Sequence, residues 1–235
     1  MNKYQVIYAD PPWDYNDKSA NRGGAARHYS TTDLEELKAM DVSSIAADNA
    51  VLAMWATWPQ LDEARELMDA WGFKYNTVLF VWVKRSKNCW TNLVRELAKE
   101  LCAQVADMSF TDLTKALLTP KGWRELVTAK RLRELMEARW YIGMGHTTRS
   151  NSEFVLVGYR GKKLPRLDKG VQQIIDAPVG DHSVKPDEAI KRIERLWGDV
   201  PRLEMFARRE SEGWDLFGNQ APNSITIPTA GKEAA

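Results

Sequence analysis

A proline pair directly after an apolar run constrains the beginning of this chain more than any other feature. Residues 4–9 have the pattern of a buried strand, and Asp10-Pro11-Pro12-Trp13 follow them. Proline has no N–H to donate to a strand ladder and does not fit a helix interior, so the chain must turn out of the sheet there. The turn leaves a carboxylate, two carbonyls and an aromatic ring at the carboxyl end of a strand, where open α/β sheets bind their ligands.

These residues suit the methylation of an amino group on a nucleobase. The exocyclic amine of a base is a weak nucleophile, because its lone pair is delocalised into the ring. Asp10 and the carbonyl of Pro11, which no intrastrand partner occupies, can each accept a hydrogen bond from the NH2 group and turn its lone pair toward a methyl donor. Trp13 can stack on the base, a contact that contributes ~1–3 kcal/mol. The alternative is an ordinary turn, with Asp10 as its cap and Trp13 in the core.

Composition limits the classes of function. The chain has 235 residues, 44% of them hydrophobic, which suffices for one α/β domain with a substantial core. Its net charge is +1, so nucleic-acid binding would depend on a local patch. Cys89 and Cys102 have the spacing of neither a metal site nor a disulfide framework, and we expect no metal and a cytoplasmic location. We find no signal peptide and no apolar run of about 18 residues, so we expect no membrane span.

Strand and helix patterns alternate along the first third of the chain. Apolar runs at 50–55 and 76–84 predict two more buried strands, and residues 59–71 predict an amphipathic helix. A capping pattern from Thr32 to Glu35 predicts the beginning of a short helix. This alternation predicts a doubly wound, largely parallel sheet.

Residues 86–138 interrupt the alternation, because they contain no convincing strand and repeat leucine at helical spacing. We expect a helical insertion with about three helices. From Lys84 to Arg139, twelve Lys or Arg stand against seven Asp or Glu, so the insertion is more basic than the whole chain. It is interpreted either as a target-recognition module for nucleic acid or as a helical lid or dimer surface.

The alternating pattern returns after the insertion, so that residues 1–85 and 139–220 are predicted to form one discontinuous domain. Strands are predicted at 153–159, 171–175, 202–207 and 214–217, and a helix at 186–197. Residues 14–30 are polar and are interpreted as a loop that closes over substrate, or as a plain surface connection. Residues 221–235 are small and polar and predict a flexible tail.

Five motifs occur in the order typical of a known enzyme family. They are Asp10-Pro11-Pro12-Trp13; Gly143-Met144-Gly145-His146 through Glu153–Gly158; His182 through Glu188; Glu204-Met205-Phe206-Ala207-Arg208; and Gly213-Trp214 to Gly218-Asn219-Gln220. By these motifs the chain resembles the adenine-N6 methyltransferases, a family that includes the catalytic subunit of the eukaryotic messenger-RNA enzyme and many bacterial and phage DNA methyltransferases. The resemblance spans residues 4–220 apart from the insertion. It implies an α/β, Rossmann-like methyltransferase sheet of the permuted class, in which the catalytic strand precedes the cofactor strand.

The resemblance also implies S-adenosylmethionine as the methyl donor. Lys185 would pair with the carboxylate of the donor, and Asn219 and Gln220 would bond its ribose hydroxyls. The alternative for the two amides is a simple turn, and for Glu204 a buried structural acid. The implied cofactor-binding residues are Asp10, Lys185, Glu204, Phe206, Arg208, Asn219 and Gln220. After the Phe-x-Arg element the eukaryotic enzyme has a histidine and an asparagine, where this chain has Arg209, Glu210 and Ser211.

The implied substrate is adenine in DNA, flipped out of the duplex or in a single strand. The catalytic residues would be Asp10, Pro11, Pro12 and Trp13, and the substrate-binding residues Trp13, Arg22, Arg27, Tyr29, His146 and Arg149. Three alternatives stay open: an RNA adenosine-N6 methyltransferase, a catalytically inactive nucleic-acid-binding subunit, and cytosine-N4 methylation. The last usually has Ser or Thr before the proline pair, so Asp10 favours adenine. A homodimer and a bacterial or phage-infected host cell are compatible with this interpretation.

Overall fold

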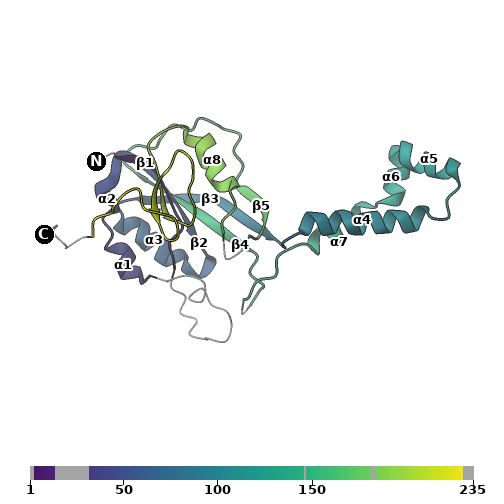
Figure 1. Cartoon of the computed structure of the whole chain (residues 1–235), viewed down its shortest axis with the longest axis horizontal. Coiled ribbons are helices and arrows are strands. Elements are labelled where there is room, and N and C mark those ends of the chain that lie inside the picture. Colours follow the sequence, from purple (N-terminus) through teal and green to yellow (C-terminus); the bar gives the residue numbers. More distant parts are fainter. Residues whose placement is uncertain (1–2, 14–31, 146, 181–183, 230–235) are drawn as a thin grey trace. The chain divides into compact units, whose positions relative to one another are not determined.

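A computed structural model describes residues 3–13, 32–145, 147–180 and 184–229 of the chain (Figure 1). The chain divides into two compact units. Unit 1 comprises Met1–Val83, Ser152–Ile175 and Asp181–Ala235, and unit 2 comprises Lys84–Asn151 and Asp176–Gly180.

Seven strands in the described residues form one sheet, in the order β5-β3-β4-β2-β1-β6-β7 (Figure 1). β1 pairs in parallel with β2 and β6, and β6 pairs in parallel with β7. β4 is antiparallel to both β2 and β3, so the expectation of a largely parallel sheet is wrong for β4. The strands are β1 (Tyr4–Ala9), β2 (Ala46–Ala56), β3 (Lys74–Arg85), β4 (Ser152–Arg160), β5 (Ile174–Pro178), β6 (Arg202–Ala207) and β7 (Asp215–Gly218).

The strand pairing brings β1 beside the strand for which the resemblance implies cofactor binding. β1 lies between β2 and β6, and Ala9 is opposite Met54 on one side and Met205 on the other. The N–H of Asp10 donates to the carbonyl of Met205 at 3.3 Å. Because the three strands are parallel, their carboxyl ends meet at one edge of the sheet. Segments that are far apart in the chain therefore share that edge, as the permuted motif order requires.

Short helices cover the two faces of the sheet in unit 1. α1 (Leu34–Lys38), α2 (Val42–Ile45) and α3 (Leu61–Ala70), which follows a 3-10 turn at Trp58–Gln60, pack on the face that carries Ile7 and Ala9. α8 (Glu188–Trp197) buries four residues of its own, on the face to which Tyr8 and Asp10 point. The helix α1 is capped by Asp33, whose carboxylate accepts from the N–H of Glu35 at 2.9 Å, and not by Thr32 as the sequence predicts.

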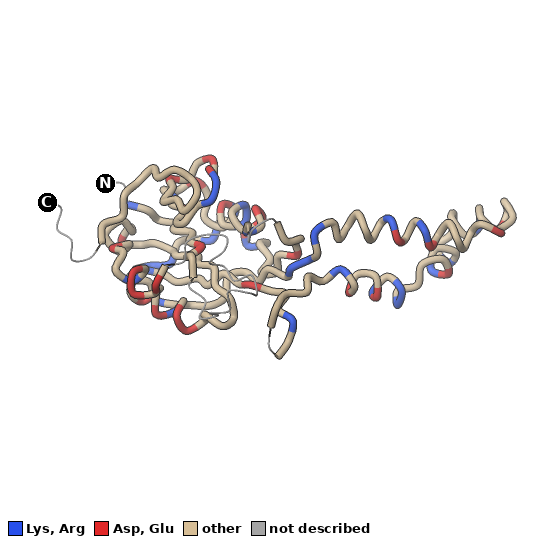
Figure 2. Tube along the Cα trace, turned by 60° about the horizontal axis from the view of Figure 1, so that its bottom comes forward, with Lys and Arg blue, Asp and Glu red and all other residues tan. Residues whose placement is uncertain are grey.

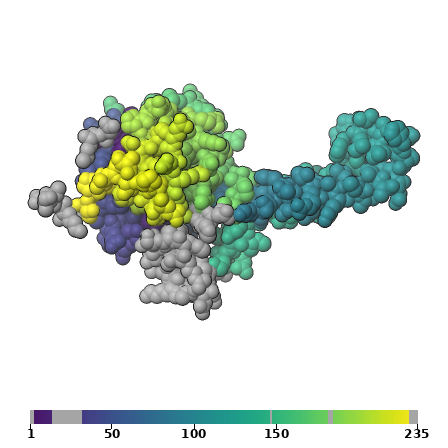
Figure 3. Space-filling view, in the orientation of Figure 1, coloured from purple at the N-terminus to yellow at the C-terminus, as the bar shows by residue number. Residues whose placement is uncertain are grey.

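The segment after β7 packs against the rest of unit 1 (Figure 3). Ile227 is 8% exposed and belongs to the main core cluster. The N–H of Asp41 donates to the carbonyl of Pro228 at 2.8 Å, and Thr229 forms a bridge with Met40. Ile225 and Ile227 thus pack on the core, whereas most of residues 221–229 are exposed, and the flexibility of the tail stays a prediction.

Unit 2 contains four helices within the described residues, where the sequence predicts about three. They are α4 (Cys89–Val105), α5 (Phe110–Leu118), α6 (Pro120–Leu126) and α7 (Ala129–Glu137). The side chains of Ser109, Thr119 and Thr128 each accept an N–H at the beginning of α5, α6 and α7. Ion pairs between Arg139 and Glu96, at 2.6 Å, and between Arg131 and Glu100 hold α7 against α4.

A buried arginine fixes the base of unit 2. The guanidinium of Arg85 bonds both carboxylate oxygens of Asp176 at 2.7 and 2.8 Å and donates to the carbonyl of Met136 at 3.0 Å. It also lies 3.7 Å from the centre of the Trp140 ring. None of the helices in the described part of the chain has the length and apolarity that a membrane span requires.

Candidate active site

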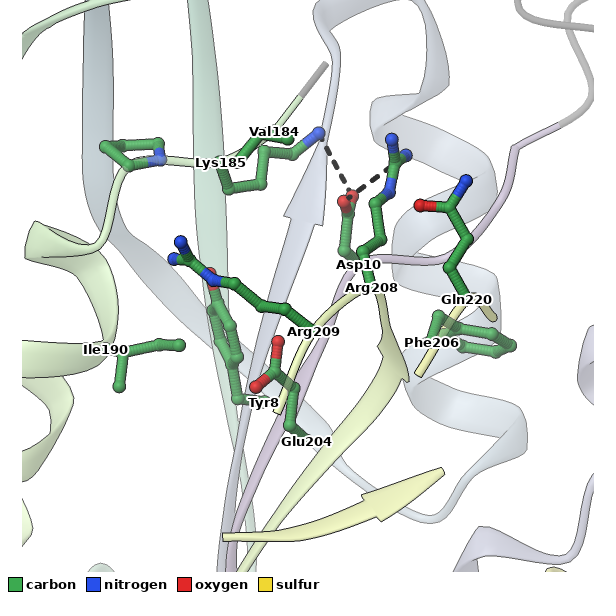
Figure 4. A pocket seen from close by; sticks show the side chains of 11 residues that line it. Tyr8, Asp10, Val184, Lys185, Ile190, Glu204, Phe206, Arg208, Arg209 and Gln220 are labelled. Carbon is green, nitrogen blue, oxygen red and sulfur yellow. Dashed lines mark ion pairs between the residues drawn. The ribbon is translucent and has the colours of Figure 1, made fainter. Parts of the chain in front are cut away.

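A pocket of about 200 Å3 lies at the carboxyl ends of β1 and β6 (Figure 4). The segment before α8 and the loop after β7 complete its wall. Six of the residues implied as cofactor-binding line it, namely Asp10, Lys185, Glu204, Phe206, Arg208 and Gln220. The structure adds five that the sequence prediction missed: Tyr8, Val184, Pro186, Ile190 and Arg209. Three of them, Val184, Pro186 and Ile190, are apolar, and only the fold reveals that the five face the pocket.

Asp10 belongs to a cluster of four charged side chains. The ammonium nitrogen of Lys185 lies 3.1 Å from Oδ1 of Asp10 and 3.2 Å from Oε2 of Glu153. The guanidinium of Arg208 lies 3.9 Å from Oδ2 of Asp10, as the dashed lines in Figure 4 show. All four side chains are only 13–16% exposed. Asp10 is therefore a nearly buried carboxylate held between two cations.

Glu153 is a member of this cluster that the sequence prediction did not place in the site. It lies near the beginning of β4, where the other side chains of the strand are mostly buried and apolar. An acidic residue in such a strand is a signal that sequence analysis could have used, because buried charges in proteins are generally paired.

Lys185 remains charged in this environment. Burial by itself would lower the pKa of Lys185, but the carboxylates of Asp10 and Glu153 outweigh it and raise the pKa above its ordinary value. The ammonium group also lies 5.5 Å from the centre of the Trp55 ring. The charge of Lys185 is thus shared between two carboxylates, and Arg208 and Arg209 are further cations that line the pocket.

Two further titratable groups line the pocket beside this cluster. Burial raises the pKa of Glu204, the hydroxyl of Ser211 lowers it by donating at 2.8 Å, and the nearby charge of Asp10 raises it. Burial likewise raises the pKa of Tyr8, whose hydroxyl accepts from the indole N–H of Trp55 at 2.5 Å. In sequence, Ser211 stands near the place where the eukaryotic enzyme has a histidine and an asparagine. The structure shows that its partner in the site is Glu204.

A strained residue shapes the far wall of the pocket. Phe206 has a φ of +62°, a conformation that costs ~1–3 kcal/mol for a bulky side chain. Stacking on Trp71, with ring centres 6.5 Å apart, and an edge contact with Phe217 at 5.9 Å hold it there. Such strain is typical of functional sites, where it re-aims the chain.

The loop that follows β7 is hydrogen-bonded to Ala207 at the end of β6. The carbonyl of Ala207 accepts the N–H groups of Asn219, Gln220 and Ala221 at 2.8–3.1 Å. The loop needs a glycine before these residues, because a Cβ on Gly218 would lie 1.8 Å from the carbonyl oxygen of Ala221. Gln220 lines the pocket as the resemblance implies, whereas Asn219 is held beside it without lining it.

The Asp10-Pro11-Pro12-Trp13 turn departs from expectation in two respects. The N–H of Trp13 donates to the carbonyl of Pro11 at 2.9 Å, so that this carbonyl already has one partner and keeps one lone pair for another. Trp13 is 6% exposed, belongs to the core cluster, and its indole N–H donates to the carbonyl of Trp55 at 3.2 Å. Trp13 therefore lies in the core, which was the alternative to base stacking in the sequence analysis.

The residues implied to bind substrate are mostly beyond what the structure describes. Arg22, Arg27, Tyr29, His146 and the loop 14–30 lie outside the described residues. Arg149 belongs to unit 2 and is exposed.

The groups that line the pocket fit a zwitterionic ligand that also carries a nucleoside. Asp10 can accept from an ammonium group, and Arg208 and Arg209 can pair with a carboxylate. Phe206 offers an aromatic face, and Gln220 an amide that both donates and accepts. S-adenosylmethionine has each of these parts, so the residues present fit the donor that the resemblance implies.

Known proteins resemble this chain over most of its length. Residues 4–105 and 124–220 match the MT-A70 family. The Type II methyltransferase M.MunI of Mycoplasma sp is 33% identical over 98% of this chain and 83% of its own length. An N(6)-adenosine-methyltransferase MT-A70-like protein of Arabidopsis thaliana and the N(6)-adenosine-methyltransferase catalytic subunit METTL3 of Homo sapiens are each 24% identical. This chain spans about a quarter of the length of these two eukaryotic proteins, 26% and 28%.

Proposed function

The chain belongs to the MT-A70 family of S-adenosylmethionine-dependent methyltransferases, and from this premise we propose that it methylates N6 of adenine in DNA. The observation that carries the proposal is the nearly buried carboxylate of Asp10 at the edge of the pocket, between Lys185 and Arg208. The Asp-Pro-Pro-Trp sequence around it is the one that suits an exocyclic amine as acceptor.

In this proposal the pocket holds S-adenosylmethionine, which supplies an electrophilic methyl group when bound. Arg208 and Arg209 pair with its carboxylate, and Lys185 helps when it exchanges one of its two carboxylate partners. Gln220, which lines the pocket, bonds the ribose hydroxyls. Phe206 provides an apolar wall of the pocket. Glu204 also lines the pocket, where its carboxylate accepts a hydrogen bond from the hydroxyl of Ser211.

Asp10 orients the acceptor amine in this mechanism. A carboxylate has about four lone-pair sites, and Lys185 and Arg208 leave capacity for an N–H of the adenine. The free lone pair of the Pro11 carbonyl accepts the second N–H. The gain comes from positioning and fixed electrostatics, without a general base before attack. The surplus proton of the methylated amine leaves afterwards through Asp10 to water.

DNA is favoured over RNA as the substrate by the pattern of relatives. The Type II methyltransferase is 33% identical to this chain, whereas the two adenosine methyltransferases are 24% identical to it. A DNA substrate would place the protein in the cytoplasm of a bacterial or phage-infected cell.

The test is mass spectrometry of nucleosides from DNA and from RNA, each incubated with the purified chain and isotope-labelled S-adenosylmethionine. We expect labelled N6-methyladenine from DNA. Labelled N6-methyladenosine from RNA alone, or labelled N4-methylcytosine, would contradict the proposed substrate.

The role of Asp10 is tested by Asp10→Asn, with Asp62→Asn on the exposed side of α3 as the matched control. We expect Asp10→Asn to lower the rate at least ~100-fold, because a preorganised partner of the reacting group is lost. Binding of S-adenosylmethionine, measured by calorimetry, should survive in both variants, because the side-chain oxygen of an asparagine at position 10 can still accept a hydrogen bond from the ammonium group of the ligand. Turnover that persists in Asp10→Asn would refute the assigned role, and the control shows whether the change of charge alone matters.

A further inference from the structure

The helix α5 of unit 2 is apolar but buries none of its residues. Phe110 is 85% exposed and Leu118 77% exposed, and Leu117 is 40% exposed. An isolated helix of nine residues is only marginally stable in water, because most helical stability in proteins comes from packing an apolar face. Within the described residues of the single chain, the apolar face of this helix therefore has no surface to pack against.

The exposed apolar face forms the end of unit 2 and extends to its neighbours. Met108 before α5 is 37% exposed, and Trp123 on α6 is 45% exposed. On the opposite side α5 is tightly held, because a Cβ on Gly122 would lie 2.4 Å from the backbone of Ala116. The face is therefore presented on a well-packed helix pair, which we call the tip (residues 107–125).

The tip differs in charge from the rest of unit 2. It contains three acidic and three basic residues, whereas residues 84–106 and 126–139 contain nine basic and four acidic ones. Figure 2 shows that basic and acidic residues alternate along α4 and α7, and the sequence places the excess of basic residues just before α4 and on α7. A neutral apolar surface is unsuited to the phosphates of a nucleic acid, which bind through Lys and Arg. It suits a partner that is itself neutral and apolar.

Nearly all of the tip also lies outside the residues that match the family. The family match covers residues 4–105 and 124–220 and omits 106–123, which include all of α5. The pocket around Asp10 is made of unit 1 residues only. An explanation of the exposed face must therefore come from something other than methyl transfer.

We propose that the tip binds the tip of a second copy of this chain. Phe110, Leu113 and Leu117 recur at i, i+3 and i+7 and so share one face of α5. In a two-fold symmetric pair, each residue meets its partner reciprocally. Two antiparallel α5 helices that cross between Leu113 and Thr114 bring Phe110 of each copy against Leu117 of the other. The stripe is thus complementary to itself.

The area of this face agrees with a reversible dimer. The exposed parts of Met108, Phe110, Leu117, Leu118 and Trp123 amount to on the order of 500 Å2 per copy, near the lower bound of ~1,000 Å2 in total for a specific interface. We therefore expect a dissociation constant in the micromolar range. Because the tip carries no net charge, added salt should leave the dimer intact.

Sedimentation velocity of the full chain over a range of concentrations tests the proposal. The wild type should shift from monomer to dimer, and Phe110→Glu should remain monomeric. A carboxylate at the exposed first position of a helix does not harm the monomer, because it meets the positive end of the helix. The matched control is Val94→Glu on α4, where the side chain is 66% exposed but outside the tip, and it should dimerise like the wild type.

A paired charge variant tests the antiparallel register. Leu117→Lys alone should be monomeric, whereas the double variant Phe110→Glu/Leu117→Lys should recover dimerisation, because each new carboxylate then faces the new ammonium group of the other copy. These two positions are seven residues apart within one helix and cannot pair with each other there. A double variant that stays monomeric overturns the register.

Two results would overturn the proposal itself. One is a wild-type chain that stays monomeric up to about 100 µM, well above the expected dissociation constant. The other is a Phe110→Glu variant that weakens DNA binding but leaves the oligomeric state unchanged, which would assign the face to nucleic acid. Methyl transfer by unit 1 is measured separately, so that failure of the proposed activity would not affect either result.

Discussion

Asp10 illustrates how the surroundings of one residue decide its chemistry. A carboxylate beside two prolines could be a simple cap, but the fold places it 3.1 Å from Lys185 and leaves it 16% exposed. Glu153 holds the same ammonium group from the other side at 3.2 Å. Since Lys185 is shared, it can turn toward a ligand without leaving Asp10 as an unpaired buried charge, because Arg208 also faces Asp10.

Glu204 gives a prediction for the pH dependence of stability. Its pKa in the fold is raised above the ordinary value of 4.5, chiefly by burial. A group with a raised pKa stabilises the fold fully below its unfolded pKa, and this contribution is lost as the pH rises through its folded pKa. Relative to Glu204→Gln, the wild type should therefore lose stability as the pH rises from about 4 to 8.

Thermal unfolding of both proteins across this pH range checks the prediction. The free-energy difference grows with the upward shift of the pKa, and 1 kcal/mol moves the Tm of a domain of this size by about 2–4 °C. We expect the Tm advantage of Glu204→Gln to grow by a few degrees with rising pH. Glu36→Gln, at an exposed position of α1, serves as the control. A constant difference between Glu204→Gln and the wild type would contradict the prediction.

At the scale of elements, the pocket depends on how two adjacent strands end. β6 ends at a residue with φ of +62°, Phe206, and the carbonyl of Ala207 then collects three N–H groups from the loop after β7. The strain at Phe206 is compensated by aromatic packing on Trp71 and Phe217. Strand end and loop thus act as one unit that presents Gln220 to the pocket.

Gly218→Ala tests this unit. The added Cβ would lie 1.8 Å from the carbonyl oxygen of Ala221, so that the loop must move and carry Asn219 and Gln220 with it. We expect the affinity for S-adenosylmethionine, measured by calorimetry, to fall about tenfold, which corresponds to ~1.4 kcal/mol.

The control for this substitution is Gly170→Ala, where the added Cβ would meet only a side-chain oxygen of Asp168, at 3.2 Å. That variant should bind S-adenosylmethionine as the wild type does. If Gly218→Ala also binds normally, the loop does not position the cofactor residues.

At the scale of the whole molecule, the chain separates its two surfaces. The pocket lies within unit 1, and the exposed apolar tip lies within unit 2. The net charge of +1 conceals a contrast, because residues 84–106 and 126–139 carry nine basic and four acidic residues, whereas the tip carries three of each. Charge patterning alone left open a target-recognition module, a helical lid or a dimer surface for residues 86–138, and the exposed apolar side chains of the tip favour a dimer surface for that part.

This separation predicts the behaviour of a chain in which a short Gly-Ser linker replaces residues 106–123. Its affinity for S-adenosylmethionine should stay within about threefold of the wild type, because no pocket residue is removed. Its self-association, measured by sedimentation velocity, should be lost. A large loss of cofactor affinity in a variant with an unchanged Tm would show that the tip supports the pocket.

The sequence by itself determined the motifs, the strand and helix order and the family resemblance. Prolines at 11 and 12, apolar runs and capping residues act locally, so that the positions of β1, α3, α8 and β6 could be predicted to within a few residues. The resemblance likewise named six residues that line the pocket, because a motif fixes residue identity in order along the chain.

Only the tertiary structure decided what depends on contacts between distant segments. It reversed β4 within the sheet, packed Ile227 into the core and placed Trp13 there as well. It brought Glu153 to Lys185, across 32 positions of sequence, and left α5 uncovered. Neither burial nor pairing is a property of a residue type. Both depend on which surfaces meet, and sequence periodicity shows that a face is apolar without showing what covers it.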